Sequence, residues 1–282
     1  MVTLPDLSTD PHGKGEGQMR RIVMITDCVD VAFNEMCGAV HAEADRIGSP
    51  ATVEPVVAVE SFSETNAAFL TRLVAETYPP GTILFTLVSK SKDLEDQHRV
   101  IWGETKSGHL FVGSNFGYYG WLARDLGVEC VYELPDVPPS SFSGKTFIAP
   151  IAARIAAGWD SALAGHPVDP TEIRDIAMET GTTVHVDSFG NIKVLRDTAD
   201  LSAGSGLEVL RNGHPLCQAT FIESQIYLQP NDGEVMIYRS TSFPDMADIA
   251  AVRGNFAARF GVNVGDVIDW RPVPALPAAG GR

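Results

Sequence analysis

Continuous apolar runs alternate with amphipathic segments in the first third of the chain, and this alternation constrains the fold most strongly. Residues 21–26 and 82–88 have the apolar character of strands buried on both faces of a parallel sheet. Between them, residues 33–44 and 69–74 carry apolar side chains at helical spacing. Strands that alternate with helices form a sheet covered by helices. We therefore expect an α/β N-terminal domain, with a mainly parallel sheet flanked by helices.

Polar residues follow two of these expected strands. Asp27 comes directly after residues 21–26, and Ser89 comes directly after residues 82–88. Ligands of open α/β sheets bind outside the carboxyl ends of the strands, so both residues are candidates for a binding site. Alternatively, Asp27 caps the N-terminus of the next helix, and this role alone would explain its position.

The pattern changes after residues 158–170, which contain Gly, Pro and Asp without periodicity. The segments that follow are short and closely spaced, which is typical of a small β-barrel or sandwich. The expected strands there are 183–186, 191–195, 207–210, 218–222, 225–228 and 234–238. The expected organisation is a flexible leader at 1–20, the α/β domain at 21–158, a linker at 159–172, the β domain at 173–270 and a flexible tail at 271–282.

Composition excludes some classes of partner. The net charge of −15 argues against nucleic acid and anionic membranes, because both require clustered Lys and Arg. The four cysteines are scattered, which favours reduced thiols over a disulfide frame or a zinc site. No apolar run approaches the roughly 20 residues of a membrane span, and the leader lacks the apolar core of a signal peptide. We expect a cytoplasmic protein without a bound metal.

A further candidate site lies in residues 184–195, where a tight turn connects two short strands. Asp187 can accept two hydrogen bonds, Asn191 can donate and accept, and Phe189 offers a flat apolar face. This set suits a ribose diol or a purine edge with a stacked ring. An ordinary hairpin, in which Asp187 and Asn191 bond only their own backbone, explains the same residues.

Four motifs in this order resemble those of the S-adenosylmethionine (SAM) hydroxide adenosyltransferases and their fluorinase and chlorinase relatives. Ile25-Thr-Asp27 resembles the family's Thr-Asp-Phe-Gly start. Residues 67–70 and 78–82 resemble its Ala-Phe-Leu-Leu and Phe-Pro-Pro-Gly-Thr segments. Residues 187–191 are similar to its Asp-x-Phe-Gly-Asn turn, and Gly254-Asn-Phe-Ala257 is similar to its Gly-Asn-Ala-Ala turn. Together the motifs extend over most of the chain.

This resemblance implies a C-terminal β-barrel and a homotrimer, with SAM bound between the N-terminal domain of one subunit and the C-terminal domain of the next. It implies that Asp27 binds the ribose hydroxyls of SAM. Phe256, in place of the family's alanine, is expected beside the adenine. The remaining adenosine-binding residues that the resemblance implies are Asp187, Phe189, Asn191 and Asn255.

The residues that activate water in the hydroxide-transferring members are replaced. Ser89 stands where those members have the aspartate of an Asp-Pro-Gly-Val-Gly loop, and Ser143-Gly-Lys-Thr146 stands where they have His-Gly-Arg-Asp. The halogenase members have a tyrosine at the position of Ser89. The hydroxide-transferring members have an arginine just after the loop; here about two extra residues precede His98 and Arg99. His98 could replace the lost base, although a histidine in a charged loop more often faces solvent.

Three functions are compatible with this pattern. The first is cleavage of SAM at C5′ by nucleophilic substitution with water, halide or another nucleophile, which releases methionine. Ser89, Ser141 and Ser143 would then donate hydrogen bonds to the nucleophile in a desolvated pocket. Capping and turn bonding are their alternative roles.

The second function is an isomerase or cyclase of specialised metabolism, and the third is a non-catalytic sensor of an adenosyl ligand. For the second function, the changed loop at residues 89–99 and a set of aromatic residues would shape a larger apolar pocket. The retained aspartates favour the first and third functions, whereas the changed water-activating motifs favour the second and third. The aromatic residues of that expected pocket are Phe116, Tyr118, Tyr119, Trp121 and Phe256.

Overall fold

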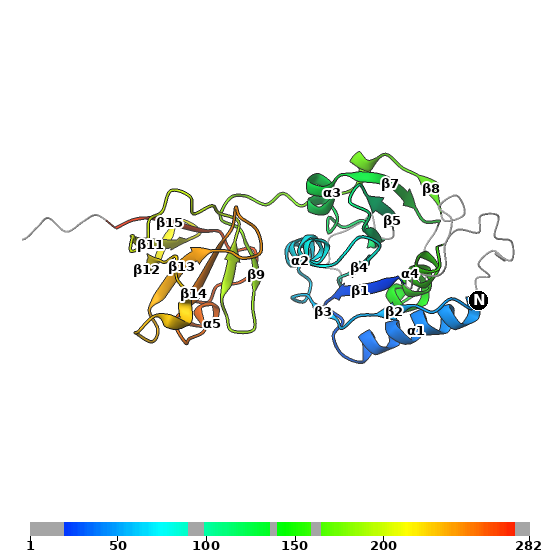
Figure 1. The fold of residues 1–282 in the computed structure, drawn as a ribbon, viewed down its shortest axis with the longest axis horizontal. Coiled ribbons are helices and arrows are strands. Elements are labelled where there is room, and N and C mark those ends of the chain that lie inside the picture. Colours follow the sequence, from blue (N-terminus) through cyan, green and yellow to red (C-terminus); the bar gives the residue numbers. More distant parts are fainter. Residues whose placement is uncertain (1–19, 90–98, 136–139, 159–164, 274–282) are drawn as a thin grey trace, which may run out of the picture. The chain divides into compact units, whose positions relative to one another are not determined.

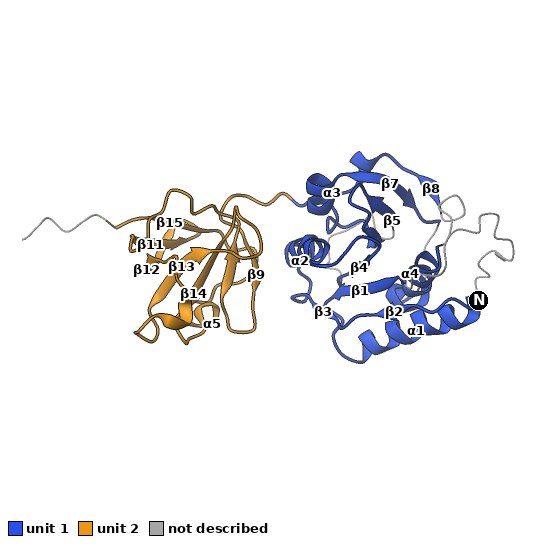
Figure 2. Cartoon of the chain, in the orientation of Figure 1, with its two compact units in different colours: residues 1–176 blue, residues 177–282 orange. Residues whose placement is uncertain are grey.

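The computed structural model contains two compact units, residues 1–176 and 177–282, which Figure 2 shows in different colours. The first unit carries helices around its sheet, whereas the second consists mainly of strands (Figure 1). The structure describes residues 20–89, 99–135, 140–158 and 165–273.

The elements of the first unit follow the expected alternation of strands and helices. They are β1 (Arg21–Thr26), α1 (Val31–Ile47), β2 (Thr52–Val53), β3 (Val57–Ala58), α2 (Glu64–Thr77), β4 (Ile83–Leu87), β5 (Val100–Thr105), β6 (Leu110–Ser114), α3 (Gly120–Leu126), β7 (Val128–Glu133), the π-helical turn η1 (Gly144–Ile148), α4 (Ala149–Ala156), β8 (His166–Pro167) and the 3-10 turn η3 (Pro170–Glu172).

The first sheet is mixed, so the expectation of a mainly parallel sheet is not confirmed. Its strand order is β2-β1-β4-β6-β5-β7-β8, with β3 also paired to β1. The pairings among β1, β2, β3, β4 and β6 are parallel, whereas β5, β7 and β8 extend the sheet by antiparallel pairing. The hairpin at Gly108 accounts for the antiparallel pairing of β5 with β6, because the N–H of Gly108 donates to the carbonyl of Thr105 (2.8 Å) where the chain reverses.

Helices cover the parallel part of this sheet. Ile22 and Ile25 of β1 are both inaccessible to solvent, which explains the unbroken apolar run of that strand. Helix α1 packs against α4, and α2 packs against α3. Met36 and Val40 form the buried face of α1 and belong to the same core cluster as Ile22. The first unit therefore has the layered arrangement expected of an α/β fold.

The second unit contains a seven-stranded sheet, two short turns of 3-10 or α-helix, and no long helix in its described part. Its elements are β9 (Thr183–Val186), β10 (Ile192–Val194), β11 (Gly206–Arg211), β12 (His214–Phe221), the 3-10 turn η4 (Ile226–Leu228), β13 (Val235–Arg239), β14 (Ala247–Ala251), α5 (Phe256–Phe260) and β15 (Ile268–Pro272).

The strand order of this sheet is β15-β11-β12-β13-β14-β10-β9. Its end strands approach one another through a single antiparallel bridge between Thr182 and Val267, beside which the N–H of Thr183 donates to the carbonyl of Asp266 (2.8 Å). The sheet is a curled half-barrel, and a closed barrel is not confirmed. Residues 225–228, expected as a strand, contain the 3-10 turn η4 instead. The described part of residues 159–172, where we expected a linker, contains β8 and η3.

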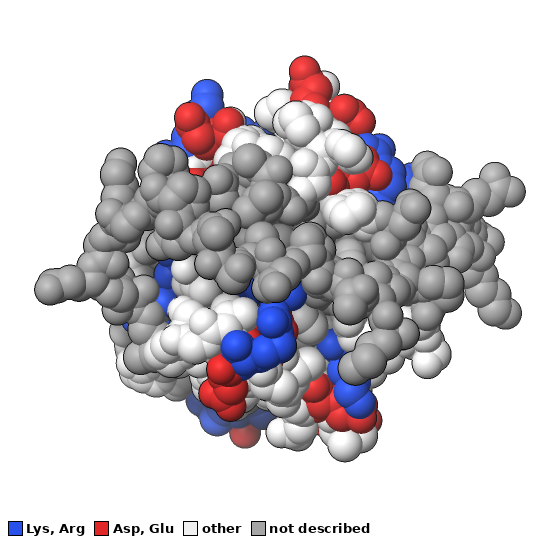
Figure 3. Space-filling model, turned by 90° about the vertical axis from the view of Figure 1, so that its right-hand side faces the viewer, with Lys and Arg blue, Asp and Glu red and all other residues white. Residues whose placement is uncertain are grey.

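The surface of the first unit carries both signs of charge. On the described surface that Figure 3 shows, Lys and Arg side chains lie beside Asp and Glu side chains. Ion pairs of this unit include Lys145 with Glu35 (2.8 Å) and Arg46 with Glu43 (2.8 Å). None of the described helices is long and apolar enough to cross a membrane. The expected absence of nucleic-acid and membrane partners stays a prediction.

Candidate functional site

The carboxylate of Asp27 connects three segments at the carboxyl ends of β1 and β4. Its Oδ1 accepts hydrogen bonds from the N–H (2.9 Å) and the hydroxyl (3.2 Å) of Ser89. Its Oδ2 accepts a hydrogen bond from the N–H of Phe62 (3.1 Å). Helix α1 is capped by Asp30, which accepts from the N–H of Ala32 (2.9 Å), so capping is not the role of Asp27. The two strand-end candidates, Asp27 and Ser89, are therefore in direct contact.

Exposed apolar residues lie close to Asp27 in the chain or bond it through their backbone. Phe62 has a left-handed backbone (φ 62°), which is uncommon for a residue with a Cβ, and its side chain is 56% exposed. Val29 and Val31, which follow Asp27 in the chain, are 51% and 69% exposed. Exposed apolar residues this near a half-buried carboxylate make the strand end a candidate ligand-binding surface.

A buried phenol supports the segment that carries Ser89. Tyr118 is buried, and its hydroxyl lies 3.5 Å from the carbonyl oxygen of Val88, to which it donates. Burial, with a smaller contribution from the charge of Glu64, raises the pKa of Tyr118 far above its usual range, so the phenol stays protonated. Tyr118 therefore acts as a hydrogen-bond donor beneath the strand end, a role that the sequence pattern did not reveal.

The other aromatic residues of this region pack inside the first unit. The ring of Tyr119 lies 4.9 Å from that of Phe111, and the ring of Trp121 lies 6.0 Å from that of Phe69. Tyr119 and Trp121 are buried, as is Tyr118. These rings pack in the interior of the first unit, and the expectation that they shape an enlarged ligand pocket stays a prediction.

The segment with Ser141 and Ser143 lies against the end of β4. A Cβ at Gly144 would overlap with the side chain of Leu87, the last residue of β4. This close approach brings Ser143, which is half-buried, to the same end of the strand as Ser89. Ser141 is exposed. His98 lies outside the described residues, and its role as a base stays a prediction.

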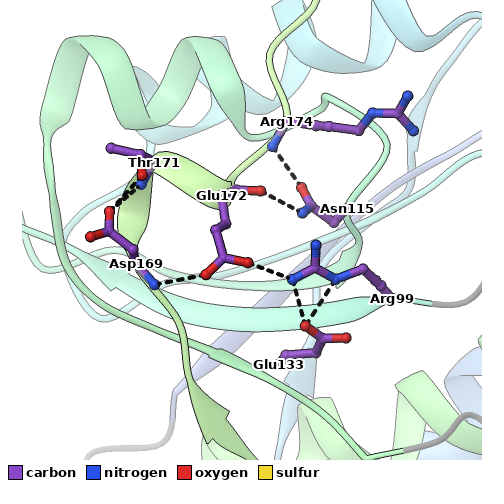
Figure 4. A network of polar contacts seen from close by, with 7 residues as sticks. All are labelled: Arg99, Asn115, Glu133, Asp169, Thr171, Glu172 and Arg174. Atoms are coloured by element: carbon purple, nitrogen blue, oxygen red, sulfur yellow. Dashed lines mark hydrogen bonds and ion pairs between the residues drawn. The ribbon is translucent and has the colours of Figure 1, made fainter. Parts of the chain in front are cut away.

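Arg99 is held by two carboxylates (Figure 4). Its guanidinium donates to Glu133 Oε2 from Nε (2.9 Å) and Nη2 (2.6 Å), and Nη2 also donates to Glu172 Oε2 (3.0 Å). These hydrogen bonds raise the pKa of Arg99 above its usual value. Asn115 binds the same segment, because its Nδ2 donates to the carbonyl of Glu172 (2.9 Å) and its Oδ1 accepts from the N–H of Arg174 (2.9 Å). Arg99 thus anchors residues 169–174 to the first sheet.

The turn at residues 187–191 is held together by its own aspartate. Asp187 Oδ1 accepts from the N–H groups of Phe189 (2.9 Å) and Asn191 (2.9 Å), and its Oδ2 accepts from Asn191 Nδ2 (2.9 Å). This is the local bonding that an ordinary hairpin would also show. Phe189 projects from the turn with 74% of its side chain exposed. The aspartate therefore fixes the turn, and the aromatic ring remains open to a partner.

The two candidate turns of the second unit are in contact. The carbonyl of Gly190 (φ 80°) accepts a hydrogen bond from the N–H of Ala257 (2.9 Å). Asn255 is exposed and caps α5, since its Oδ1 accepts from the N–H of Ala258 (2.7 Å). Phe256 is fully buried in the core. The ring of Phe256 faces the interior of the single chain, and its expected place beside the adenine stays a prediction.

A polar row crosses the same sheet beside the turn, and the sequence pattern did not reveal it. In the strand register, Lys193 lies opposite His185 on one side and opposite Asp248 on the other. Asp248 in turn lies opposite Tyr238. Lys193 Nζ lies 2.8 Å from Asp248 Oδ2. Burial, with a smaller contribution from Lys193, lowers the pKa of His185. Burial and the nearby charges of Asp248 and Asp187 raise the pKa of Tyr238. The available signal was His185 on a short strand that ends just before Asp187.

No group of three His, Cys, Asp or Glu side chains within the described ranges has the arrangement of a metal site.

Two solved structures share the fold. A crystal structure of an uncharacterized conserved protein from Thermotoga maritima superposes with a TM-score of 0.76 at 18% identity, over 89% of this chain and 100% of that one. A conserved hypothetical protein from Thermus thermophilus superposes with a TM-score of 0.66 at 18% identity, over 90% and 100%.

Sequence comparison gives the family. Over 125 residues the chain is 30% identical to (R)-S-adenosyl-L-methionine hydrolase from Methanocaldococcus jannaschii, a match that covers 43% of this chain and 44% of that protein. The chain thus spans less than half of the length of this curated relative. Residues 22–165 match the model of the SAM hydroxide adenosyltransferase N-terminal domain. The chain therefore belongs to the SAM hydroxide adenosyltransferase family.

Proposed function

We propose that the protein binds SAM and cleaves it at C5′ by nucleophilic substitution, with release of methionine. The observation that carries this proposal is the Asp27 carboxylate, which lies at the carboxyl ends of β1 and β4 inside the region that matches the family. It is half-buried and accepts a hydrogen bond from the N–H of Phe62, and both Phe62 and nearby Val29 are exposed. A carboxylate in such a setting suits the two hydroxyls of a ribose, and the apolar side chains suit the ring of a nucleoside.

The second unit supplies a complementary surface. Phe189 offers an exposed aromatic face for the adenine, and Asn191 and Asn255 lie on the two turns that meet at Gly190. We also propose that the protein is a homotrimer, in which SAM lies between the first unit of one protomer and the second unit of a neighbour. Phe62 and Phe189 support this, because both aromatic side chains are exposed in the single chain and would be covered by the ligand and the neighbour.

The reaction requires little covalent chemistry from the protein. The sulfonium of SAM is an activated leaving group, so the protein must align a nucleophile opposite sulfur and remove bulk water. With water as nucleophile, the O–C5′ bond forms while the C5′–S bond breaks. Sulfur keeps the electron pair, the water proton passes to solvent, and the products are adenosine and methionine.

Ser89 determines which nucleophiles are compatible with this site. A serine hydroxyl donates a hydrogen bond and carries no charge, so it orients water and does not repel an anion. The aspartate that the hydroxide-transferring members have at this position would repel a halide. Ser143, at the same end of β4, is a second neutral donor of this kind. Water and chloride are therefore both candidate nucleophiles.

A non-catalytic SAM sensor is the second candidate function. It is favoured by Arg99, because the arginine expected to help orient water is bound to Glu133 and Glu172 (Figure 4). In this case the protein would hold SAM without consuming it.

Mass spectrometry after incubation of the purified protein with SAM in a chloride buffer tests the proposal. Adenosine with methionine identifies water as the nucleophile, and 5′-chloro-5′-deoxyadenosine identifies chloride. SAM that binds and is recovered intact supports the sensor and contradicts the cleavage reaction. Asp27→Ala should abolish SAM binding, whereas the exposed Asp45→Ala is the matched control. An Asp27→Ala variant that is folded and binds SAM with unchanged affinity would refute the site.

A further inference from the structure

Asp27 has too few acceptor positions for its present donors and for a ribose together. An ionised carboxylate offers about four lone-pair positions. Oδ1 accepts from the N–H and the hydroxyl of Ser89, and the thiol of Cys28 lies 3.8 Å from the same oxygen. Oδ2 accepts from the N–H of Phe62, and the N–H of Ser89 also lies within 3.1 Å of it. Oδ1 is therefore fully occupied by protein donors.

These donors differ in how easily they can move away from the carboxylate of Asp27. The N–H groups of Ser89 and Phe62 are fixed by the backbone. The hydroxyl of Ser89 turns by rotation about one side-chain bond, a motion that exposed side chains complete in picoseconds to nanoseconds. A ribose diol that donates one hydrogen bond to each carboxylate oxygen must therefore displace the Ser89 hydroxyl from Oδ1, while the backbone contact remains.

We propose that the Ser89 hydroxyl is a latch: it is bound to Asp27 in the ligand-free protein, and the ribose diol displaces it toward the nucleophile. The inference rests on the proposed function. Its geometric basis is that one residue contributes both a fixed and a rotatable donor to the same carboxylate, at 2.9 and 3.2 Å. Tyr118 keeps the backbone in place during the rotation, because its hydroxyl donates to the carbonyl of Val88.

The latch makes Ser89 a specificity-determining residue. The hydroxyl is free to donate to the nucleophile only after a diol has taken its place on Asp27. A ligand with an incomplete diol leaves the hydroxyl on the carboxylate, and the nucleophile then lacks a donor. Recognition of the ribose and positioning of the nucleophile are coupled through one side chain.

Calorimetry with adenosine and 2′-deoxyadenosine, on the full-length protein, tests the latch. Ser89→Ala removes the competing donor, so it should bind adenosine about 3- to 10-fold more tightly than the wild type. The gain should be smaller for 2′-deoxyadenosine. Ser89→Thr retains the hydroxyl and should resemble the wild type, and Ser202→Ala, at an exposed position of the second unit, is the control.

Turnover of SAM gives a second readout. Loss of the donor should lower kcat of Ser89→Ala at least about tenfold while KM also falls, whereas a merely structural effect would raise KM. Adenosine affinity that is unchanged or weaker in Ser89→Ala would overturn the latch alone. A wild type that binds neither adenosine nor SAM would instead overturn the proposed function. The affinity comparison needs no turnover, so it tests the latch in a sensor as well.

Discussion

Replacement of Gly190 by alanine tests whether the two turns of the second unit depend on each other. Gly190 has a φ of 80°, a conformation that strains any residue with a Cβ. The added Cβ would also overlap with Asn255 Oδ1, the atom that accepts the N–H of Ala258 and caps α5. The amide of Asn255 would have to leave this position, and the substitution would therefore damage both turns.

The expected loss of stability is the sum of two contributions. The left-handed backbone costs a residue with a Cβ about 1–2 kcal/mol. Loss of the helix cap costs about 1 kcal/mol. Together they lower the free energy of unfolding of the second unit by about 2–3 kcal/mol, which for a domain of this size is a decrease in Tm of roughly 10–20 °C. Thermal unfolding followed by circular dichroism measures this change.

Gly213 provides a matched control. It also has a φ of 80°, but a Cβ at Gly213 would meet no atom within 4 Å. Gly213→Ala should therefore lower the free energy of unfolding by the contribution of backbone strain alone. In an Asn255→Ala background, Gly190→Ala should cost no more than Gly213→Ala, because the overlapping amide is absent. Equal destabilisation by Gly190→Ala and Gly213→Ala in the wild-type background would refute the coupling of the two turns.

Two further predictions concern the anchor and the polar row. Arg99→Met removes partly exposed ion pairs to Glu133 and Glu172, so the free energy of unfolding should fall by at most about 1 kcal/mol, and less at high salt. Limited proteolysis should then cut residues 165–176 faster, and an unchanged cleavage rate would show that other contacts hold this segment. The pKa of His185 is lowered by burial, so the unfolded chain binds the proton more tightly and stability falls as the pH drops through 6.5. His185→Gln should weaken this pH dependence in urea unfolding, and an unaltered slope would contradict the assignment.

The order of strands and helices in the first unit could be predicted because burial on both faces leaves an unbroken apolar run, as in β1 and β4. The direction of the strands could not be predicted from the sequence. Strand β6 is as fully buried as β4, although it pairs in parallel with β4 and antiparallel with β5. An apolar run shows that a strand is buried and says nothing of the direction of its neighbours.

Local chemistry was easier to predict than long-range contacts. The position of Asp27 at a strand end and the bonding of the 187–191 turn follow from neighbouring residues. Arg99 bonds Glu172, which lies 73 positions further along the chain, and no local sequence pattern predicts such a pair. The burial of Phe256 had a signal, because Phe260 follows at helical spacing and the two rings pack at 4.9 Å.

The hydrogen bonds of Asp27 have a consequence for folding. This carboxylate receives donors from residues 35 and 62 positions further along the chain, Phe62 and Ser89. Those donors reach it only after β3 and β4 have paired with β1. A partly folded chain therefore lacks the proposed adenosyl site, and a ligand that binds there stabilises the completed first unit. Adenosine would then raise the yield of folded protein for destabilised variants of the first unit.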